Sequence, residues 1–505
     1  MQRSAFCFLF LATPLAAQAP NRSLEHAAAT ITEADVARRV NIIAHDSMLG
    51  RDTPSRGLDL TAQYIADEFK RFGLKPGGDS GTWFQRYNIT RSRLNPAESH
   101  VGFMLGNSHV HADLSKDARY LYGGVPAEEI GGPAVLFAGT FDTSSAVAGL
   151  VKDKVALVVV DRSSGPFPVN ATRLFRALVQ AKPKGIVIIS NRDSATFAME
   201  TGRQGSVRLA IEGVQGPGVP VVEVHERAIG PVLAAAGINA AELRSSTRWV
   251  SQPVAGLTVM IDLKQTVLDR GSAPNTIGII EGTDPQLKNE YLVYSAHMDH
   301  IGVTAGRPDS INNGADDDAS GTVGVVELAE AFSKARPRRS VIFITVSGEE
   351  KGLWGSQYFA DHPTVPVANM IANINIDMIG RNWTDTIVAI GKEHSDLGAT
   401  LLRVNQAHPE LRMTAIDDRW PQENFYSRSD HYNFARKGVP VLFFFNGTHE
   451  DYHRPSDSPD KIDSEKEARI LQLLFYLGQD IANAPQRPRW NPESYKQIVE
   501  GAGTR

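Results

Sequence analysis

From Asn275 onward, segments that resemble buried strands alternate with segments that resemble helices. Short runs that are apolar on both faces predict strands over 276–280, 290–295, 340–346, 370–376 and 439–445. Helices are expected over 321–334, where Val325, Leu328, Ala329 and Phe332 share one face, and over 466–482. Strands that are apolar on both faces need cover on both sides. The pattern therefore predicts an α/β fold, an α/β/α sandwich around a largely parallel, mixed sheet.

The 505 residues are too many for one compact core, so we expect at least two domains. The region from about 110 to 260 differs from the rest, with short strands expected over 134–137, 155–160 and 185–189 and few closely spaced His, Asp or Glu residues. We expect residues 111–260 to form a small β-rich inserted domain without a catalytic role. Residues 20–110 and 261–490 would together form the main domain.

The N-terminus has the features of a cleavable export signal over residues 1–19. A short basic start precedes the apolar run 5–12, and Ala17-Gln18-Ala19 offers a small-x-small cleavage site. A buried N-terminal helix is the alternative, but polar sequence without apolar periodicity follows directly. We therefore expect an exported protein, periplasmic or secreted. No later apolar run reaches the ~20 residues of a membrane span.

The only cysteine, Cys7, lies inside this expected signal, so the mature protein would have no disulfide and no thiolate. Any metal site must then use His, Asp and Glu. The net charge of −5 argues against nucleic acid as a partner.

Five polar segments follow apolar strands or lie in turns, and each carries possible metal ligands. In parallel sheets the carboxyl ends of strands lie at one edge, so these side chains are expected to meet there. The segments are His297-Met298-Asp299, the acidic loop 312–321, the Ser347–Gly352 turn, Asn375–Gly380 and Asp451–Asp457.

Two histidines and three or more carboxylates, without thiolates, suit a pair of divalent cations. Such pairs serve hydrolysis, with one carboxylate bridging the metals and another, not bound to metal, moving the proton. The adjacent Glu349 and Glu350 can supply a ligand and a proton acceptor, because neighbours on an extended segment point apart. Asp299 shares a strand face with His297 and could orient its ring. Taken singly, His297 could be a core histidine and Asp316–Asp318 a capping loop; together the segments make that reading improbable.

This set resembles the zinc-dependent exopeptidase family that includes aminopeptidase Y, bacterial leucine aminopeptidases and glutamate carboxypeptidase II. Asp46–Arg51 and 62–77 look like the lead-in of the bacterial members, and the middle region looks like a protease-associated domain. The resemblance implies two zinc ions per chain, whereas spacing alone does not decide which residue of Asp316–Asp318 bridges them. The implied metal ligands are His297 and Asp377 on one metal, Glu350 and His453 on the other, and Asp317 between them.

The resemblance also implies catalytic roles. Glu349 would be the general base toward a metal-bridging water, and Tyr452 would hydrogen-bond the tetrahedral intermediate. Ser429, Asp430 and His431 resemble a loop that family members place near the substrate.

We therefore expect an exported two-zinc exopeptidase that acts on peptides, most simply an aminopeptidase. A carboxypeptidase or dipeptidase of the glutamate carboxypeptidase type is a close alternative. A single-zinc glutaminyl cyclase and an inactive receptor-like binding protein are further ones, which the complete set of implied ligands disfavours. Oligomeric state and side-chain preference stay open.

Overall fold

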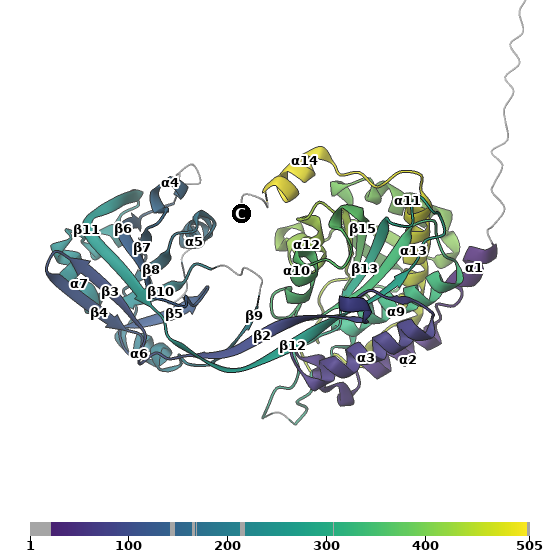
Figure 1. The fold of residues 1–505 in the computed structure, drawn as a ribbon, viewed down its shortest axis with the longest axis horizontal. Helices are drawn as coiled ribbons and strands as arrows, with labels where there is room; N and C mark the ends of the chain where they lie inside the picture. Colours follow the sequence, from purple (N-terminus) through teal and green to yellow (C-terminus); the bar gives the residue numbers. More distant parts are fainter. Residues whose placement is uncertain are drawn as a thin grey trace, which may run out of the picture. The chain divides into compact units, whose positions relative to one another are not determined.

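The computed structural model describes residues 22–501, except 142–146, 164–166, 168, 213–217 and 307. The expected export signal lies outside the described residues. The chain forms two compact units, one made of the segment up to Gln85 together with that from Pro274 onward, the other of Arg86–Ala273. Figure 1 shows the course of the chain from purple to yellow.

The first unit is built on a mixed sheet of strand order β17-β16-β18-β15-β13-β14-β12, with β1 paired to β12. The central strands β14, β13, β15 and β18 are mutually parallel, whereas β12 and β16 run antiparallel to their neighbours β14 and β18. The strands are β1 (Lys75–Pro76), β12 (Gln265–Ile280), β13 (Tyr291–His297), β14 (Ser340–Val346), β15 (Met370–Ile376), β16 (Thr386–Ile390), β17 (Thr414–Ile416) and β18 (Val441–Phe444).

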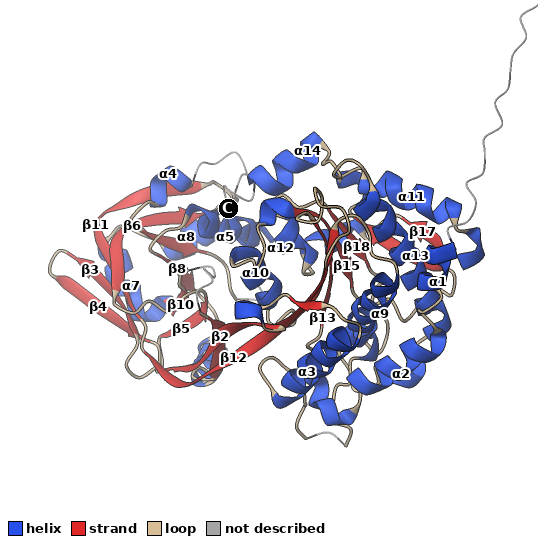
Figure 2. Cartoon of the chain, turned by 45° about the vertical axis from the view of Figure 1, so that its right-hand side comes forward, coloured by secondary structure: helices blue, strands red, loops and turns tan. Residues whose placement is uncertain are grey.

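Helices cover both faces of this sheet. Figure 2 shows α9 and α13 on one side and α10 and α12 on the other, and α2 packs on α9 and α13. The helices are α1 (Arg22–Ala28), α2 (Glu33–Ile43), α3 (Arg56–Arg71), α9 (Gly321–Lys334), α10 (Trp354–Asp361), α11 (Leu397–Ala407), α12 (His431–Ala435), α13 (Ser464–Asn483) and α14 (Pro492–Tyr495). The α/β/α sandwich expected from the sequence is confirmed, because every residue of β13, β14 and β15 is buried except Tyr291, which is partly exposed. No helix in the described part of the chain is both long and apolar enough to cross a membrane.

The second unit contains an eight-stranded mixed sheet of order β4-β3-β11-β6-β7-β8-β10-β5. Alternate residues of its central strands fill two separate apolar cores, one on each face; Leu136, Leu157 and Val187 belong to one, and Phe137, Val158 and Ile188 to the other. Its elements are β2 (Phe84–Leu94), β3 (His100–Leu105), β4 (Ser108–Asp113), β5 (Ala118–Tyr122), β6 (Ile130–Ala138), α4 (Ala148–Val151), β7 (Val155–Val159), α5 (Val169–Ala181), β8 (Gly185–Ser190), α6 (Ser194–Gly202), β9 (Val207–Ile211), β10 (Val221–His225), α7 (Glu226–Ala235), α8 (Ala240–Ser245) and β11 (Val250–Asp262).

The second unit is longer than the expected inserted segment 111–260. Strand β3 pairs along its whole length with β11, and β4 pairs with β3, so residues 100–113 belong to this sheet. The chain passes from one unit to the other within β2, between Gln85 and Arg86, and returns within β12, between Ala273 and Pro274. Both crossing points lie outside the expected segment 111–260. Strand β3 finds its partner β11 about 150 residues further along the chain, a pairing that local sequence patterns do not reveal.

Candidate active site

Four parallel strands deliver the expected side chains to one edge of the first sheet. His297 is the last residue of β13, and Asp377 follows directly on β15. Glu349 and Glu350 lie just after β14, and His453 lies in the turns after β18. Asp317 lies in the acidic loop that leads into α9. The strand order β14-β13-β15-β18 thus brings together residues that are up to 156 positions apart.

The first cluster contains His297, Asp317 and Asp377. His297 Nε2 lies 3.3 Å from Asp317 Oδ1 and 3.7 Å from Asp377 Oδ1. The other oxygen of Asp377 accepts a hydrogen bond of 2.9 Å from the Ser429 hydroxyl, which holds the carboxylate in place. All four side chains are almost completely buried.

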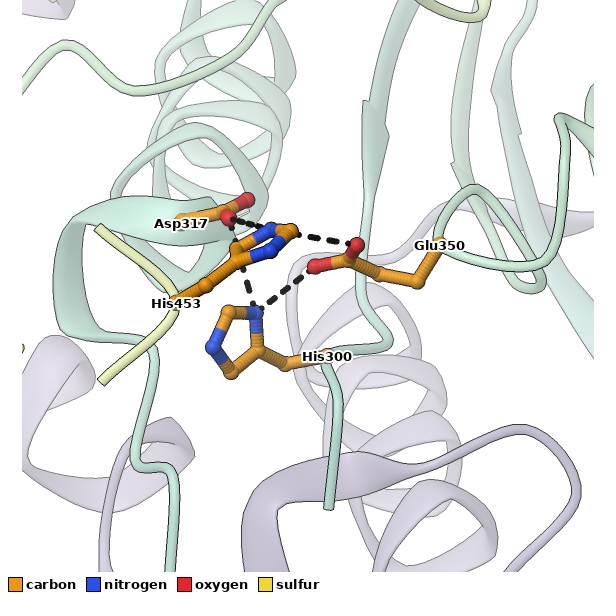
Figure 3. Close-up of side chains that lie close together, drawn as sticks. All are labelled: His300, Asp317, Glu350 and His453. Atoms are coloured by element: carbon orange, nitrogen blue, oxygen red, sulfur yellow. Dashed lines mark ion pairs between the residues drawn. The ribbon is translucent and has the colours of Figure 1, made fainter. Parts of the chain in front are cut away.

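The second cluster contains His300, Asp317, Glu350 and His453 (Figure 3). His453 Nε2 lies 3.1 Å from Asp317 Oδ2 and 3.2 Å from Glu350 Oε2. His300 Nδ1 lies 2.9 Å from Glu350 Oε1 and 3.6 Å from Asp317 Oδ2. His300 stands three residues after His297 and was not among the metal ligands predicted from the sequence.

Asp317 belongs to both clusters, one through each carboxylate oxygen. Its neighbours have other tasks. Asp316 Oδ1 accepts a 2.7 Å hydrogen bond from the Gly380 amide. Asp318 accepts hydrogen bonds from the amides of His297, Gly321 and Met378 at 2.8–3.2 Å. The geometry therefore favours Asp317 as the shared carboxylate and gives Asp316 and Asp318 the task of holding the loop against the strand ends.

The donor atoms of the second cluster fit a divalent cation. Asp317 Oδ2, Glu350 Oε1, His453 Nε2 and both ring nitrogens of His300 are buried without a hydrogen-bond partner. Burying such atoms unpaired is costly, and a bound metal ion removes the cost. Burial alone would lower the pKa of His453, but Asp317 and Glu350 raise it to about 10. The carboxylates of Asp317 and Glu350 thus favour a positive charge beside His453, and a divalent cation can supply it.

Asp299 contacts His297 mainly through its backbone. Its carbonyl oxygen lies 3.1 Å from His297 Nδ1, while its carboxylate Oδ1 is 3.8 Å away. The carboxylate accepts hydrogen bonds from the Thr53 hydroxyl (3.0 Å) and the Glu349 amide (3.2 Å). Burial raises the pKa of Asp299 to about 7. Asp299 thus links the His297 ring to the backbone of Glu349.

Glu349 and Tyr452 line a pocket beside the first cluster. Burial raises the pKa of Glu349 well above its usual range, as a proton acceptor for hydrolysis requires. The Tyr452 ring stacks on His453 at 3.9 Å between ring centres. The pocket is lined by His297, Asp317, Glu349, Asp377, Met378, Phe425, Arg428, Ser429, Phe443, Phe445, Thr448 and Tyr452.

Of the expected substrate loop, Ser429 lines the pocket, while its two neighbours lie deeper. Asp430 is fully buried, and burial raises its pKa to about 6. The His431 ring stacks on Phe443 at 4.3 Å, and its Nε2 donates a 2.7 Å hydrogen bond to the Tyr426 carbonyl. Burial lowers the pKa of His431 to about 3, so the ring is neutral in the fold.

Arg51 is a second residue at the site whose role the sequence does not reveal. Its fully buried guanidinium donates to four carbonyl oxygens, those of Ile43, Met298, Asn313 and Gly314, at 2.6–3.0 Å. It therefore ties the end of the His297 strand to the acidic loop. In the sequence, the segment Asp46–Arg51 stands out only through its resemblance to the lead-in of the bacterial family members.

Two clusters of candidate metal ligands thus share one carboxylate at the carboxyl edge of an α/β sheet, an arrangement that suits metal-assisted hydrolysis. Comparison with known proteins gives the family. Residues 275–478 match the profile of Peptidase family M28, and they contain all the expected metal ligands. The chain thus carries an M28 peptidase domain.

Curated relatives agree with this assignment. A "Probable zinc metalloprotease" of Pyrenophora tritici-repentis is 32% identical over 300 residues, which cover 50% of this chain and 62% of the relative. "Aminopeptidase YwaD" of Bacillus subtilis is 25% identical over 239 residues, which cover 45% of this chain and 49% of that protein. The chain spans about half to three fifths of the length of the curated relatives it matches.

A solved structure supports the fold over nearly the whole chain. The aminopeptidase from Aneurinibacillus sp. strain AM-1 has a TM-score of 0.50 at 18% identity, covering 93% of this chain and 98% of that one. This match includes the inserted unit as well as the peptidase domain.

Proposed function

We propose that the protein is a two-zinc aminopeptidase that removes N-terminal residues from peptides. The observation that carries the proposal is Asp317, whose two oxygens face two separate ligand clusters. His297 and Asp377 would hold one ion, and Glu350 and His453 the other. When bound, the metal pair activates water and polarises the scissile carbonyl.

The chain's own residues would complete the reaction. Glu349 lines the pocket beside Asp317 and His297, and its raised pKa suits it to take a proton and return it to the leaving amine. Asp299 fixes both the Glu349 amide and the His297 ring. Tyr452 lies at the pocket wall, where its hydroxyl could donate to the oxygen that becomes negative in the transition state.

The pocket favours an aminopeptidase over a carboxypeptidase. Recognition of a C-terminal carboxylate calls for a free basic group, but Arg428 lies 3.4 Å from Glu423 and over the Phe425 ring. Arg381, the other arginine close to the motifs, pairs with Asp451 at 3.2 Å. Met378, Phe425, Phe443 and Phe445 make much of the remaining wall apolar. We therefore expect preference for an apolar side chain at the substrate's N-terminus.

The name "Aminopeptidase" of the Bacillus and Aneurinibacillus proteins supports the same activity. We also propose that residues 1–19 direct export and that the inserted β-rich unit is a protease-associated domain. Two clusters with a shared Asp317 disfavour a cyclase with one zinc, and the complete ligand set disfavours an inactive receptor.

The test is hydrolysis of aminoacyl chromogenic substrates by the purified protein, compared with the same compounds carrying a blocked amine. We expect cleavage of leucyl and phenylalanyl substrates, loss of activity with a zinc chelator, and recovery on adding zinc. Cleavage only of N-blocked substrates would contradict the aminopeptidase proposal, and activity that survives complete zinc removal would contradict the metal chemistry.

A further inference from the structure

We propose that His300 is a fourth protein ligand of the metal ion held by Asp317, Glu350 and His453, and that it binds through Nδ1. This inference rests on the two-metal site proposed above. The family resemblance implied five ligands and left His300 out. With His300 added, the two metals have different surroundings, and their affinities and roles should differ.

The four side chains converge, since each offers a ligand atom within 4.8 Å of the others, and Glu350 faces His300 with Oε1 and His453 with Oε2. With metal–ligand bonds of about 2.0 Å, two ligands of a tetrahedron lie about 3.3 Å apart. His300 Nδ1 is 2.9 Å from Glu350 Oε1 and 3.6 Å from Asp317 Oδ2. His453 Nε2 is 3.1 Å from Asp317 Oδ2 and 3.2 Å from Glu350 Oε2. Figure 3 shows the four side chains turned toward one common centre.

Hydrogen bonding does not account for the position of His300. Its side chain is completely buried, and neither ring nitrogen has a hydrogen-bond partner. Glu350 Oε1 also lacks one, although it lies 2.9 Å from His300 Nδ1. The two atoms are thus close but poorly aligned for a hydrogen bond, which is expected when both point at a third centre instead of at each other.

The backbone fixes the His300 ring in this orientation. The His300 amide donates to the Arg51 carbonyl at 3.2 Å. Gly314 closes over the ring so tightly that a Cβ on it would lie 2.6 Å from ring atoms Cγ and Cδ2. Gly314 also has a φ of +57°, so a glycine is required there on both counts. The loop that carries Asp317 is therefore shaped around His300.

The two metal sites would differ in how open they are. With four protein ligands a zinc ion can take the reacting water only as a fifth ligand, whereas three protein ligands leave a tetrahedral position open for water or substrate. His297, Asp317 and Asp377 line the substrate pocket, while His300 and Glu350 lie outside its lining. The ion beside His297 would therefore meet the substrate, and the ion beside His300 would be bound more tightly and exchange more slowly.

The experiment is metal titration of the metal-free protein with Zn²⁺ and Co²⁺, in wild type, His300→Ala and the exposed-histidine control His111→Ala. Wild type and the control should bind two ions with unequal affinity. In H300A the tighter site should weaken at least about 100-fold, and the Co²⁺ absorption of that site should change, because the coordination changes. The second site should titrate as in wild type.

A second variant reports ligation directly. In His300→Cys the thiolate can take the place of the imidazole, so Co²⁺ should produce a sulfur-to-metal charge-transfer band. With the export signal removed, the chain has no other cysteine that could give such a band.

The outcomes separate the proposals. Two ions that bind H300A with wild-type affinity and an unchanged Co²⁺ spectrum would overturn the role of His300 and leave the two-metal site standing. If metal-free H300A melts far below metal-free wild type while the zinc-induced rise in Tm stays the same, His300 is a packing residue only. Failure of wild type itself to bind two ions would refute the two-metal site.

Discussion

Both units contain parallel strands packed between apolar layers, yet the buried acid on β10 and the acids at the edge of the peptidase sheet have opposite surroundings. In the inserted unit Glu223 on β10 is completely buried and is paired with Arg162 at 3.1 Å and Arg119 at 3.2 Å. At the edge of the peptidase sheet Asp317 and Asp377 are buried and the Glu350 side chain is nearly so; their ion pairs run to histidines, and Asp377 accepts a hydrogen bond from Ser429. Arginines of the fold thus neutralise Glu223, whereas the acids at the sheet edge are placed to receive positive charge from a bound ion. The comparison teaches that a buried carboxylate marks a metal site only where the fold withholds arginine and lysine from it.

The largest effect is expected for Glu349→Gln. This variant keeps the size of the side chain and loses the proton acceptor, so hydrolysis should fall by about 10²–10⁴-fold, while zinc content stays at the wild-type level. Steady-state kinetics with metal analysis of the same sample checks this. Activity close to wild type would remove Glu349 from the mechanism.

Substitution of the shared carboxylate should affect both metals at once. Asp317→Asn should lower the affinity for both ions, while Asp377→Asn should lower it mainly for one, because Asp377 contacts only the His297 cluster. Zinc titration monitored by a competing chromophoric chelator distinguishes the two. If D317N affected only one ion, Asp317 would not bridge.

The matching change in the inserted unit should act on stability and not on metal. Glu223→Gln removes the buried negative charge that Arg162 and Arg119 face, which should cost about 3 kcal/mol of unfolding free energy. Denaturant unfolding measures this loss, and zinc stoichiometry should stay unchanged. A loss of zinc in E223Q would contradict the expectation that Glu223 contributes to stability and not to metal binding.

The smallest effect concerns His431, whose ring is held neutral by burial. Its pKa is about 3 in the fold, below the usual 6.5, so the unfolded chain takes up a proton first as the pH falls. Stability should therefore decline below pH 6.5, by about 2 kcal/mol at pH 5. His431→Phe removes this term, so its unfolding free energy should fall less than that of wild type between pH 7 and pH 5. If the unfolding free energies of wild type and His431→Phe fell equally between pH 7 and pH 5, His431 would not take up a proton on unfolding.

Much of this arrangement could be predicted from sequence. Strands that are apolar on both faces predicted the α/β/α sandwich. The position of the candidate ligands just after these strands predicted that they meet at the carboxyl edge of the sheet. The choice of Asp317 could not come from spacing, because it depends on which backbone amides Asp316 and Asp318 accept from. His300 was overlooked because it stands beside a stronger candidate, and Arg51 because its four carbonyl partners are spread from residue 43 to residue 314.

The most direct test of the two-metal site is zinc titration of the metal-free wild-type protein, followed by elemental analysis after dialysis. Two tightly bound ions per chain are predicted, because Asp317 offers one oxygen to each ligand cluster. One ion or none per chain, in a protein that is folded and fully metal-free at the start, would contradict it.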